Sequence, residues 1–317
     1  MRSSSPKTPP THQTGAHKPK RNSRSGKTTR PPKLVTSALE MQKVAQEFRQ
    51  NGKRVGFVPT MGALHEGHLS LVRQARASAD VVVVSIFVNP LQFGKGEDLS
   101  RYPRTFERDR ALCQSEHVDI IFVPPVEDMY PEGFQTRMSA GKLARPMEGM
   151  VRPGHFNGML TVVAKLFQLV LPEFAVFGEK DFQQLRLVQQ MVRDFFMPVE
   201  VVAGPVVREA DGLAMSSRNR YLPAGMRRRA SVVYRALAHA QEIAARGDAT
   251  RTEIVRAAQA VLDTEPKFSA QYVKLVNPDT LVSMKASEMH GRLLIAGHLG
   301  QRPRVRLIDN VAIEIAR

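Results

Sequence analysis

The chain has 317 residues, 42% hydrophobic and 24% charged, which is typical of a globular protein of about two domains. Its single cysteine, Cys113, excludes an internal disulfide and a cysteine-based zinc site, and no apolar run is long enough to cross a membrane. The formal charge of +16 would suit a nucleic-acid partner, but nine of the 46 basic residues lie in the acid-free segment 1–33. The moderately basic remainder suits an enzyme with anionic substrates equally well.

Segment 1–33 is composed largely of Ser, Thr, Pro, Lys and Arg. It has almost nothing to bury, so we expect a disordered basic tail. It lacks the apolar stretch of a secretory signal, and its prolines oppose the amphipathic helix of a transit peptide. The run Gly-Lys-Thr-Thr at 26–29 matches only the end of a P-loop, because Arg21 stands where that motif requires glycine. Weak binding of this tail to nucleic acid or acidic surfaces remains an alternative.

Strand and helix patterns alternate along the first part of the body. Apolar runs predict strands at 55–58, 81–88, 118–123, 174–177 and 199–202, and helical periodicity predicts helices at 36–50, 69–79, 106–117, 155–171 and after 181. This alternation predicts an α/β fold with a parallel, doubly wound sheet. After residue 206 two Ala- and Arg-rich helices, at 223–246 and 251–264, precede strands at 271–276, 293–298 and 304–315. They predict a smaller α+β domain.

The stretch 55–69 is predicted to form a strand, a glycine turn and a helix that starts near Gly67. Pro59 ends the strand, and Gly62 lets the backbone approach a ligand. His65 and His68 share the first helical turn, where free N–H groups favour an anion. A zinc-protease motif would need i, i+4 spacing on an established helix. The context favours phosphate recognition, with two exposed polar histidines as the alternative.

Three further groups of polar residues accompany the ends of predicted strands or the interdomain loop. Ser216, Ser217 and Arg218 offer hydroxyl and guanidinium donors for a polyphosphate, although a serine-rich loop is the simpler interpretation. The run 178–181 combines a glycine with Lys180, or else forms a surface turn. Gln92 and Gln184 lie near the same carboxyl edge, where α/β sheets bind ligands, and each could instead be structural.

Six ordered blocks in these segments resemble the signature of the pantothenate synthetase (pantoate–β-alanine ligase) family. The blocks are Pro-Thr-Met-Gly-Ala-Leu-His-Glu-Gly-His (59–68), Phe-Val-Asn-Pro-Leu-Gln-Phe (87–93), Tyr-Pro-Arg-Thr (102–105), Arg-Pro-Gly-His-Phe (152–156), Gly-Glu-Lys-Asp-Phe-Gln-Gln-Leu (178–185) and Met-Ser-Ser-Arg-Asn (215–219). The resemblance extends from about residue 34 to the end. The departures are the basic tail and a C-terminal domain that does not align in detail.

The resemblance implies a Rossmann-like, doubly wound sheet of the HIGH-type nucleotidyltransferases, with a nucleotide-binding domain at 34–206 and an α+β lid domain at 207–317. It implies a cytoplasmic homodimer that acts on ATP, pantoate and β-alanine, with Mg²⁺ as cofactor and no nucleic-acid or membrane partner. ATP and pantoate would form pantoyl adenylate and pyrophosphate, and β-alanine would then release AMP to give pantothenate. The alternatives are another adenylyl transferase of the superfamily and a basic RNA-binding protein.

The resemblance also implies roles for individual residues. His65 and His68 would be catalytic, with His68 the proton donor, and Gln92 and Gln184 would bind pantoate. Gln92 would also reach β-alanine. Mg²⁺ would bridge phosphate oxygens mainly through water, with Asp109 as a candidate contact. The residues expected to bind ATP are Met61, Gly62, Ala63, Leu64, His65, Glu66, Gly67, His68, Gly178, Glu179, Lys180, Asp181, Val207, Met215, Ser216, Ser217 and Arg218.

Overall fold

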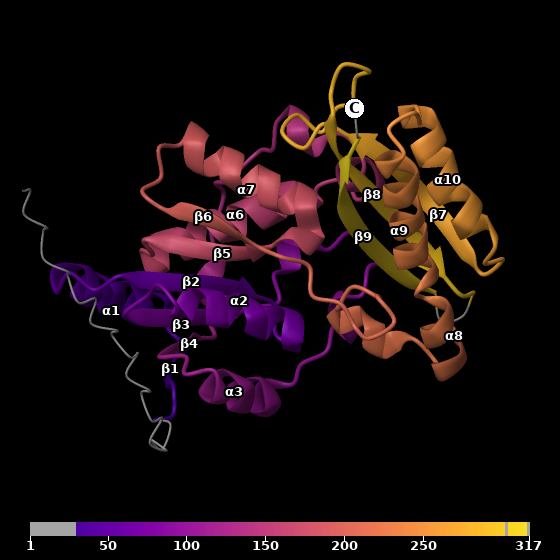
Figure 1. Ribbon diagram of the computed structural model, residues 1–317. Helices are drawn as coiled ribbons and strands as arrows, with labels where there is room; N and C mark the ends of the chain where they lie inside the picture. Colours follow the sequence, from indigo (N-terminus) through magenta and orange to yellow (C-terminus); the bar gives the residue numbers. More distant parts are fainter. Residues whose placement is uncertain (1–29, 302–303, 316–317) are drawn as a thin grey trace, which may run out of the picture.

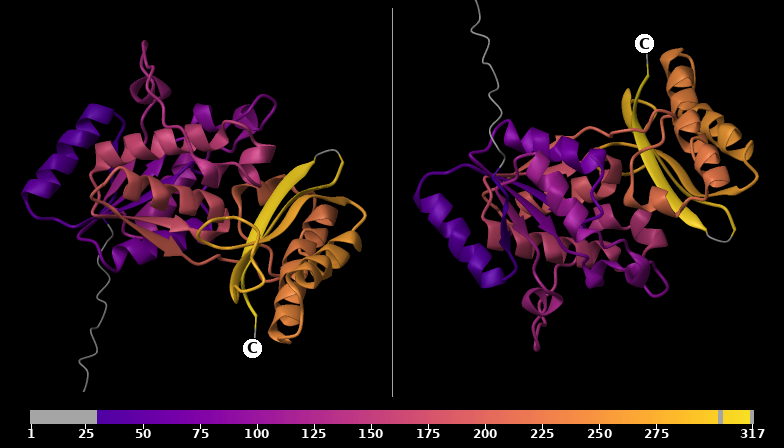
Figure 2. Two further views of the ribbon diagram at one scale, coloured as in Figure 1. Left: turned by 90° about the horizontal axis from the view of Figure 1, so that it is seen from above. Right: turned by 90° about the horizontal axis from the view of Figure 1, so that it is seen from below.

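The computed structural model describes residues 30–301 and 304–315, which form two domains (Figure 1). The domains lie side by side in both views of Figure 2. Residues 1–29 of the expected tail lie outside the described residues. Lys33, which we placed at the end of that tail, is instead the first residue of β1 (Lys33–Val35) and pairs with Ile120.

The first domain contains the predicted parallel sheet. Its other strands are β2 (Val55–Thr60), β3 (Val81–Ile86), β4 (Ile120–Phe122), β5 (Phe174–Gly178) and β6 (Glu200–Gly204). Their spatial order is β1-β4-β3-β2-β5-β6, and all neighbours are parallel. The chain proceeds outward from β2 to β4 and then returns to the other side of β2 with β5, so the sheet is doubly wound, as predicted. The edge strand β1 was not predicted.

Helices cover both faces of this sheet (Figure 1). Side chains alternate along a strand, so Phe57 and Val83 pack against α1 (Ala38–Gln50), α6 (His155–Val170) and α7 (Phe182–Asp194). Val58 and Val84 pack against α2 (Glu66–Arg76) and α3 (Phe106–Ser115). The short elements between them are η1 (Pro90–Gln92), η2 (Leu99–Arg101), α4 (Val126–Met129), η3 (Lys142–Ala144), α5 (Glu148–Val151) and η4 (Glu179–Asp181).

The second domain packs two helices on a three-stranded antiparallel sheet of order β7-β8-β9. Its elements are η5 (Ser217–Tyr221), α8 (Ala224–Arg229), α9 (Val232–Ala245), α10 (Arg251–Asp263), β7 (Phe268–Val276), β8 (His290–Leu299) and β9 (Val305–Glu314). The single helix expected at 223–246 was wrong, because the chain breaks between α8 and α9. The two linking residues, Ala230 and Ser231, still have right-handed helical backbone, so the break is a short interruption between two consecutive helices.

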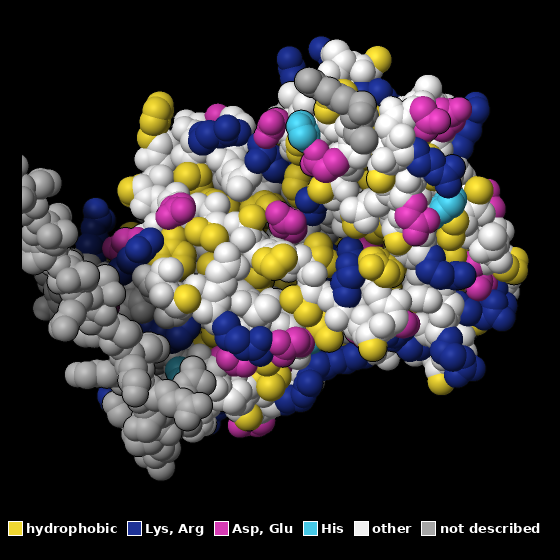
Figure 3. Space-filling view, viewed as in Figure 1, with side chains coloured by type: hydrophobic (Ala, Val, Ile, Leu, Met, Phe, Trp, Pro, Cys, Tyr) yellow, Lys and Arg dark blue, Asp and Glu magenta, His cyan; other side chains and the backbone are white. Residues whose placement is uncertain are grey.

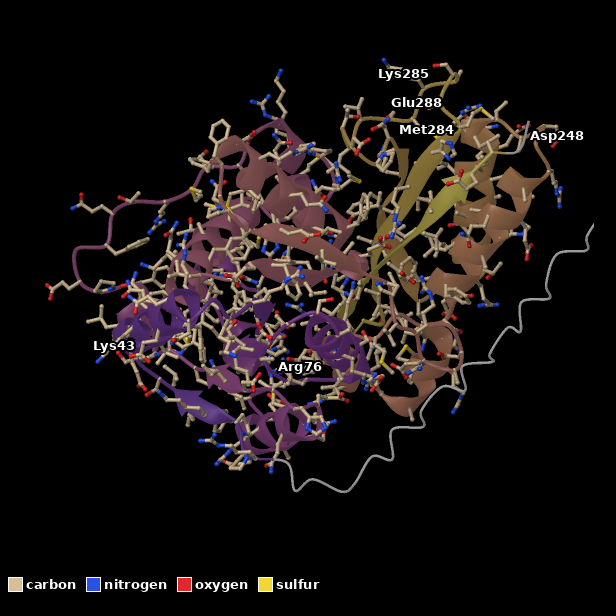
Figure 4. The ribbon with its side chains drawn as sticks, turned by 60° about the vertical axis from the view of Figure 1, so that its left-hand side comes forward. Lys43, Arg76, Asp248, Met284, Lys285 and Glu288 are labelled. Atoms are coloured by element: carbon tan, nitrogen blue, oxygen red, sulfur yellow. The ribbon has the colours of Figure 1, made fainter. Side chains whose placement is uncertain are left out.

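Each face of the second sheet has its own apolar cover. Leu293 and Ile295 face α9 and α10, whereas Leu294 and Tyr272 pack with Phe182 of the first domain. Because Phe182 belongs to the first domain, the second sheet also forms part of the boundary between the domains. Figure 4 shows Met284, Lys285 and Glu288 at the outer end of the second domain, apart from Lys43 and Arg76 on the first. Within the described ranges no helix is both long and apolar enough to cross a bilayer.

Gly158 of α6 sets how closely this helix approaches η1. A Cβ atom at Gly158 would lie 2.0 Å from the Leu91 carbonyl oxygen, whereas a Cβ atom at Gly225 of α8 would meet nothing within 4 Å. We expect Gly158→Ala to lower the free energy of unfolding by about 1–3 kcal/mol through overpacking. The matched change Gly225→Ala should raise it by about 0.5–1 kcal/mol, because alanine is the better helix former. Urea unfolding of both variants measures this difference, and equal stabilities would contradict the close contact.

Candidate active site

The two central strands β2 and β5 separate at their carboxyl ends. β2 pairs with β3 at six positions but with β5 only at Gly56–Phe174 and Phe57–Ala175. The turns that follow β2 and β5 therefore flank an opening at the point where the strand order reverses. This is the place where doubly wound sheets bind their ligands.

The turn after β2 is held by a buried carboxyl group. Gly62 and Ala63 both have left-handed backbone, with φ of 81° and 51°. The Asp109 oxygens accept hydrogen bonds from the backbone N–H of Ala63 at 2.8 Å and of Leu64 at 2.9 Å, and a third from Thr105 at 3.1 Å. These bonds offset the strain of a left-handed alanine and fix where α2 begins.

His65 and His68 lie together at the start of α2. Their ring centroids are 4.0 Å apart, and the His65 backbone N–H donates to His68 Nδ1 at 3.3 Å. A neutral His68 ring that accepts at Nδ1 carries its proton on Nε2. Gly67 leaves room for the His65 ring, since a Cβ atom at this position would lie 3.0 Å from it. Among the described residues, the buried His65 Nδ1 has no hydrogen-bond partner.

Both imidazoles are neutral in the free protein at pH 7. Burial lowers the pKa of His65 to about 2, and the positive charge of Lys180 adds to this effect. Burial also lowers the pKa of His68 to about 4, partly opposed by the carboxyl group of Asp181. An anionic ligand between these groups would favour protonation of the rings.

The turn after β5 faces the histidines from the neighbouring strand. Lys180 lies in η4, and its Nζ is 3.8 Å from an Asp181 oxygen. Gln184 follows in the first turn of α7 and lines the same cavity. A cation and an amide thus stand opposite two neutral imidazoles.

The loop that begins the second domain reaches back to the histidine turn. The Ser217 hydroxyl donates to the Ala63 carbonyl at 3.3 Å, so the two predicted clusters are in direct contact. Arg218 donates two hydrogen bonds of 2.9 Å to Asp98, and its guanidinium lies 5.7 Å from the Tyr102 ring centroid. Asp98 therefore occupies a position next to the Arg218 guanidinium that an anionic ligand could take instead.

Gln92 is buried at the bottom of the opening. Its Oε1 accepts from the Asn89 amide at 3.0 Å, and its Nε2 lies 3.1 Å from the Met61 sulfur. Its backbone carbonyl lies 2.8 Å from His155 Nδ1. Because a thioether is a weak acceptor, the Gln92 amide N–H remains available to an oxygen ligand.

One cavity of about 220 Å³ is lined by the two histidines, by Lys180 and Gln184, by Gln92 and by the loop at Ser217 and Arg218. It adjoins a crevice of about 560 Å³ between the domains, and Arg152, Lys180 and Arg218 belong to both. The predicted residues that line the cavity are Met61, His65, Gly67, His68, Gln92, Gly178, Lys180, Asp181, Gln184, Val207, Met215, Ser216, Ser217 and Arg218.

Five predicted ATP-binding residues, Gly62, Ala63, Leu64, Glu66 and Glu179, do not line either space. The N–H groups of Ala63 and Leu64 are bonded to Asp109, and Gly62 contributes only its left-handed backbone. Glu66 pairs with Arg73 at 2.5 Å on the surface of α2, and Glu179 pairs with Arg292 of the second domain at 2.9 Å. Gly62, Ala63 and Leu64 thus shape the turn after β2, and the binding of ATP by these five residues stays a prediction.

The placement of Asp109 also differs from our expectation. We considered it a contact for Mg²⁺, but it is only 1% exposed and both of its oxygens accept hydrogen bonds from the turn. In the described part of the chain no cluster of three or more His, Cys, Asp or Glu side chains could hold a metal. Asp109 therefore belongs to the frame of the histidine turn, because its oxygens already accept the hydrogen bonds of that turn.

The cavity also contains residues that our sequence reasoning left without a role. Asn89, Tyr102, Arg152 and His155 are polar members of its lining, and its apolar end is formed by Phe87, Met159, Val162, Val163, Leu166 and Phe177. The first four stand inside the quoted blocks, so polar residues in those blocks were the available signal. The apolar members look like ordinary core positions in sequence, and only the structure shows that they face a cavity.

A doubly wound sheet with histidines, a lysine and an arginine around its switch point defines an α/β nucleotide-binding enzyme. Residues 33–312 match the family model described as pantoate-beta-alanine ligase. The chain is 54% identical to pantothenate synthetase of Thermus thermophilus over 260 residues, which cover 82% of this chain and 93% of the relative. It is 48% identical to that of Caldicellulosiruptor bescii, covering 89% and 99%. The chain therefore belongs to the pantoate–β-alanine ligase family.

Solved structures agree with this assignment. The crystal structure of pantothenate synthetase from Thermus thermophilus matches with a TM-score of 0.82 and 50% identity, over 88% of this chain and 98% of the other. The pantoate–β-alanine ligase from Francisella tularensis, a complex with β,γ ATP and β-alanine, matches with a TM-score of 0.74 and 34% identity over 88% and 97%. Both matches include the two domains described above.

The neutral histidines predict how stability depends on pH. Unfolded histidine has a pKa near 6.5, so below that pH the unfolded chain binds protons that the folded chain does not. The free energy of unfolding should therefore fall as pH drops from 6.5 toward 5, by up to about 1.4 kcal/mol per pH unit for each such histidine. His68→Asn should make the slope of the unfolding free energy against pH smaller by the contribution of one histidine, because the variant no longer binds that proton when it unfolds.

The matched control is Thr252→Asn, a change at an exposed residue of α10 that has no titratable side chain. It should leave the pH dependence as it is in the parent protein. Urea unfolding at several pH values measures the slopes. An identical slope for the parent and His68→Asn would contradict a histidine that is buried in its neutral form.

Proposed function

We propose that this crevice joins (R)-pantoate to β-alanine with ATP, through a pantoyl-adenylate intermediate, and releases pyrophosphate and AMP. The observation that carries the proposal is the meeting of the two strand-end turns. The His65–His68 turn after β2 and the Lys180 turn after β5 face one cavity that also contains Gln92 and Gln184. Cationic and neutral donors thus surround a space large enough for a small acid beside a nucleotide phosphate.

The first step needs alignment and charge neutralisation more than a base. A carboxylate such as that of pantoate is already ionised at pH 7, so it can attack the α-phosphorus directly. His68 carries its ring proton on Nε2 and can donate it to a phosphate oxygen. The anionic triphosphate would raise the low pKa of this ring, which supports His68 as the proton donor and His65 as a second phosphate contact.

The nucleotide would be held from both domains. Lys180, Ser216, Ser217 and Arg218 would bind the phosphates, and Arg218 would exchange the Asp98 carboxylate for a phosphate of similar charge and geometry. The ribose and adenine would lie against Gly178, Asp181, Val207 and Met215, which line the same cavity. Mg²⁺ would neutralise the phosphates when bound and would be held by their oxygens and water.

The acid would occupy the inner end of the cavity. Gln92 and Gln184 offer amide donors to the hydroxyl and carboxylate oxygens of pantoate. The apolar end, which includes Met159, Val162 and Val163, fits the branched alkyl part of this substrate. Gln92 would also reach β-alanine, whose amine must be neutral to attack the adenylate.

The resemblance to the family also supports a cytoplasmic homodimer in which residues 207–317 act as a lid over residues 34–206. The crevice between the domains supports the lid, because a nucleotide that binds there touches both. The measurement that tests the whole proposal is release of AMP from ATP. It should require pantoate and β-alanine together.

Replacing His68 tests its role in the first step. His68→Ala should lower the rate of pyrophosphate formation from ATP and pantoate by about 10²–10³, because a donor to the developing charge is lost. The overall fold should persist, as measured by circular dichroism. The control His239→Ala changes a histidine far outside the cavity lining and should keep the parent rate. Near-parent activity of His68→Ala would remove this residue from the chemistry.

The two alternative functions have their own tests. Another adenylyl transferase would exchange pyrophosphate with other acids and not with pantoate. An RNA-binding protein is suggested only by charge, and on the face in Figure 3 Lys and Arg are intermixed with Asp and Glu over both domains. A chain starting at Arg30, which keeps β1, should form pyrophosphate and bind RNA weakly. Tight RNA binding with a steep salt dependence, together with no pyrophosphate, would favour the RNA-binding alternative.

A further inference from the structure

Strand β9 of the second domain contacts the backbone that carries Lys180. The side-chain amide of Asn310 donates hydrogen bonds to the carbonyl oxygens of Glu179 at 3.0 Å and of Lys180 at 2.9 Å. Asn310 is only 2% exposed, so these bonds are shielded from water. A single side chain from one domain thus binds two consecutive peptide groups of the other.

Asn310 is itself held in one orientation. Its Oδ1 accepts from Arg292 Nε at 2.6 Å, which identifies the opposite side of the amide as the donor. Its backbone N–H donates to Asp309 at 2.7 Å, and Asp309 forms an ion pair with Arg208 at 2.5 Å. Its donors can therefore point only toward the turn.

Arg292 binds the same turn through a side chain. Its guanidinium donates to Glu179 Oε2 at 2.9 Å and lies 4.4 Å from the ring centroid of Phe182, the first residue of α7. The turn is therefore held at its two carbonyls, at a carboxylate and at the start of the following helix. Every one of these contacts comes from the second domain.

We infer that Asn310 is a positioning residue for nucleotide binding: it fixes the backbone from which Lys180 projects, so that this lysine is placed only when the second domain is docked. The inference rests on the proposed role of Lys180 at the phosphates. A misplacement of about 1 Å at such a group costs about 10²-fold in rate, so a backbone anchor has a measurable effect.

Two variants separate the donor function from the rest of the side chain. Asn310→Asp keeps an oxygen for Arg292 but puts an oxygen against the two carbonyls, and Asn310→Leu removes both functions. At pH 8, with pantoate and β-alanine saturating, each should lower kcat/KM for ATP by about 10- to 100-fold. The KM for pantoate should change by less than about twofold, since Gln92 and Gln184 are not touched.

The matched control breaks another contact between the domains. Asp279 of the second domain forms an ion pair of 2.7 Å with Arg186 of α7, and its side chain is 74% exposed. Asp279→Ala should leave the kinetics of ATP unchanged. A loss with Asn310→Leu but not with Asn310→Asp would assign the effect to Arg292 and overturn the inference. So would equal losses in kcat with every KM unchanged, because that pattern indicates fewer folded molecules.

The lysine provides the final test. In a Lys180→Met background, either change at Asn310 should lower kcat/KM for ATP by less than about a further twofold, because residues that act as a unit are not additive. If the losses multiply, Asn310 acts elsewhere and the inference is wrong. If Lys180→Met alone leaves the kinetics of ATP unchanged, the proposed role of Lys180 fails. A loss in Lys180→Met with none at Asn310 would overturn only the positioning inference.

Discussion

The structure depends on a buried carboxyl group beneath the histidine turn. Asp109 accepts two backbone hydrogen bonds from residues that directly follow a left-handed glycine, and one of those residues is a left-handed alanine. Without an acceptor at this place the buried N–H groups would be unpaired, and the turn would lose the geometry that starts α2 at His65. Ser217 binds the opposite side of the same turn, at the Ala63 carbonyl. The turn is thus held by Asp109 of the first domain through its N–H groups and by Ser217 of the second domain through a carbonyl group.

The candidate site is an assembly of two strand ends and one interdomain loop. The histidines come from β2, Lys180 from β5, and Arg218 from the segment that enters the second domain. Polar contacts that cross the boundary connect them: Asn310 with the Lys180 turn, Arg218 with Asp98, and Glu148 with Tyr272 at 2.7 Å. The buried apolar contact of Phe182 with the second sheet supplies the common platform. The geometry of the site consequently depends on how the two domains are arranged, because the same contacts hold both.

The sequence allowed the sheet and most of the cavity lining to be predicted, because those signals are local. Buried strands are continuous apolar runs, and the histidine turn is marked by its glycines and by a recognisable block. The roles of Asp109 and Asn310 could not be predicted, since the backbone groups that they hold in the two turns lie 45 or more residues away in sequence. The same limit applies to β1, which is three residues long and is a strand only because β4 lies beside it. The break after α8 spans only Ala230 and Ser231, which both keep right-handed helical backbone, so helical periodicity does not show it.

The short pairing between β2 and β5 has a consequence for how the chain folds. The Val55 N–H donates to the Glu173 carboxylate across 118 residues of sequence, and the two paired positions follow directly. Closing so long a loop costs conformational entropy before its few contacts form, so we expect this junction to form late in folding. A sheet that contains β2 but not yet β5 would include the histidine turn and lack the turn of Lys180. If Lys180 binds the nucleotide phosphates as proposed, full nucleotide affinity and the stabilisation that accompanies it require the completed sheet.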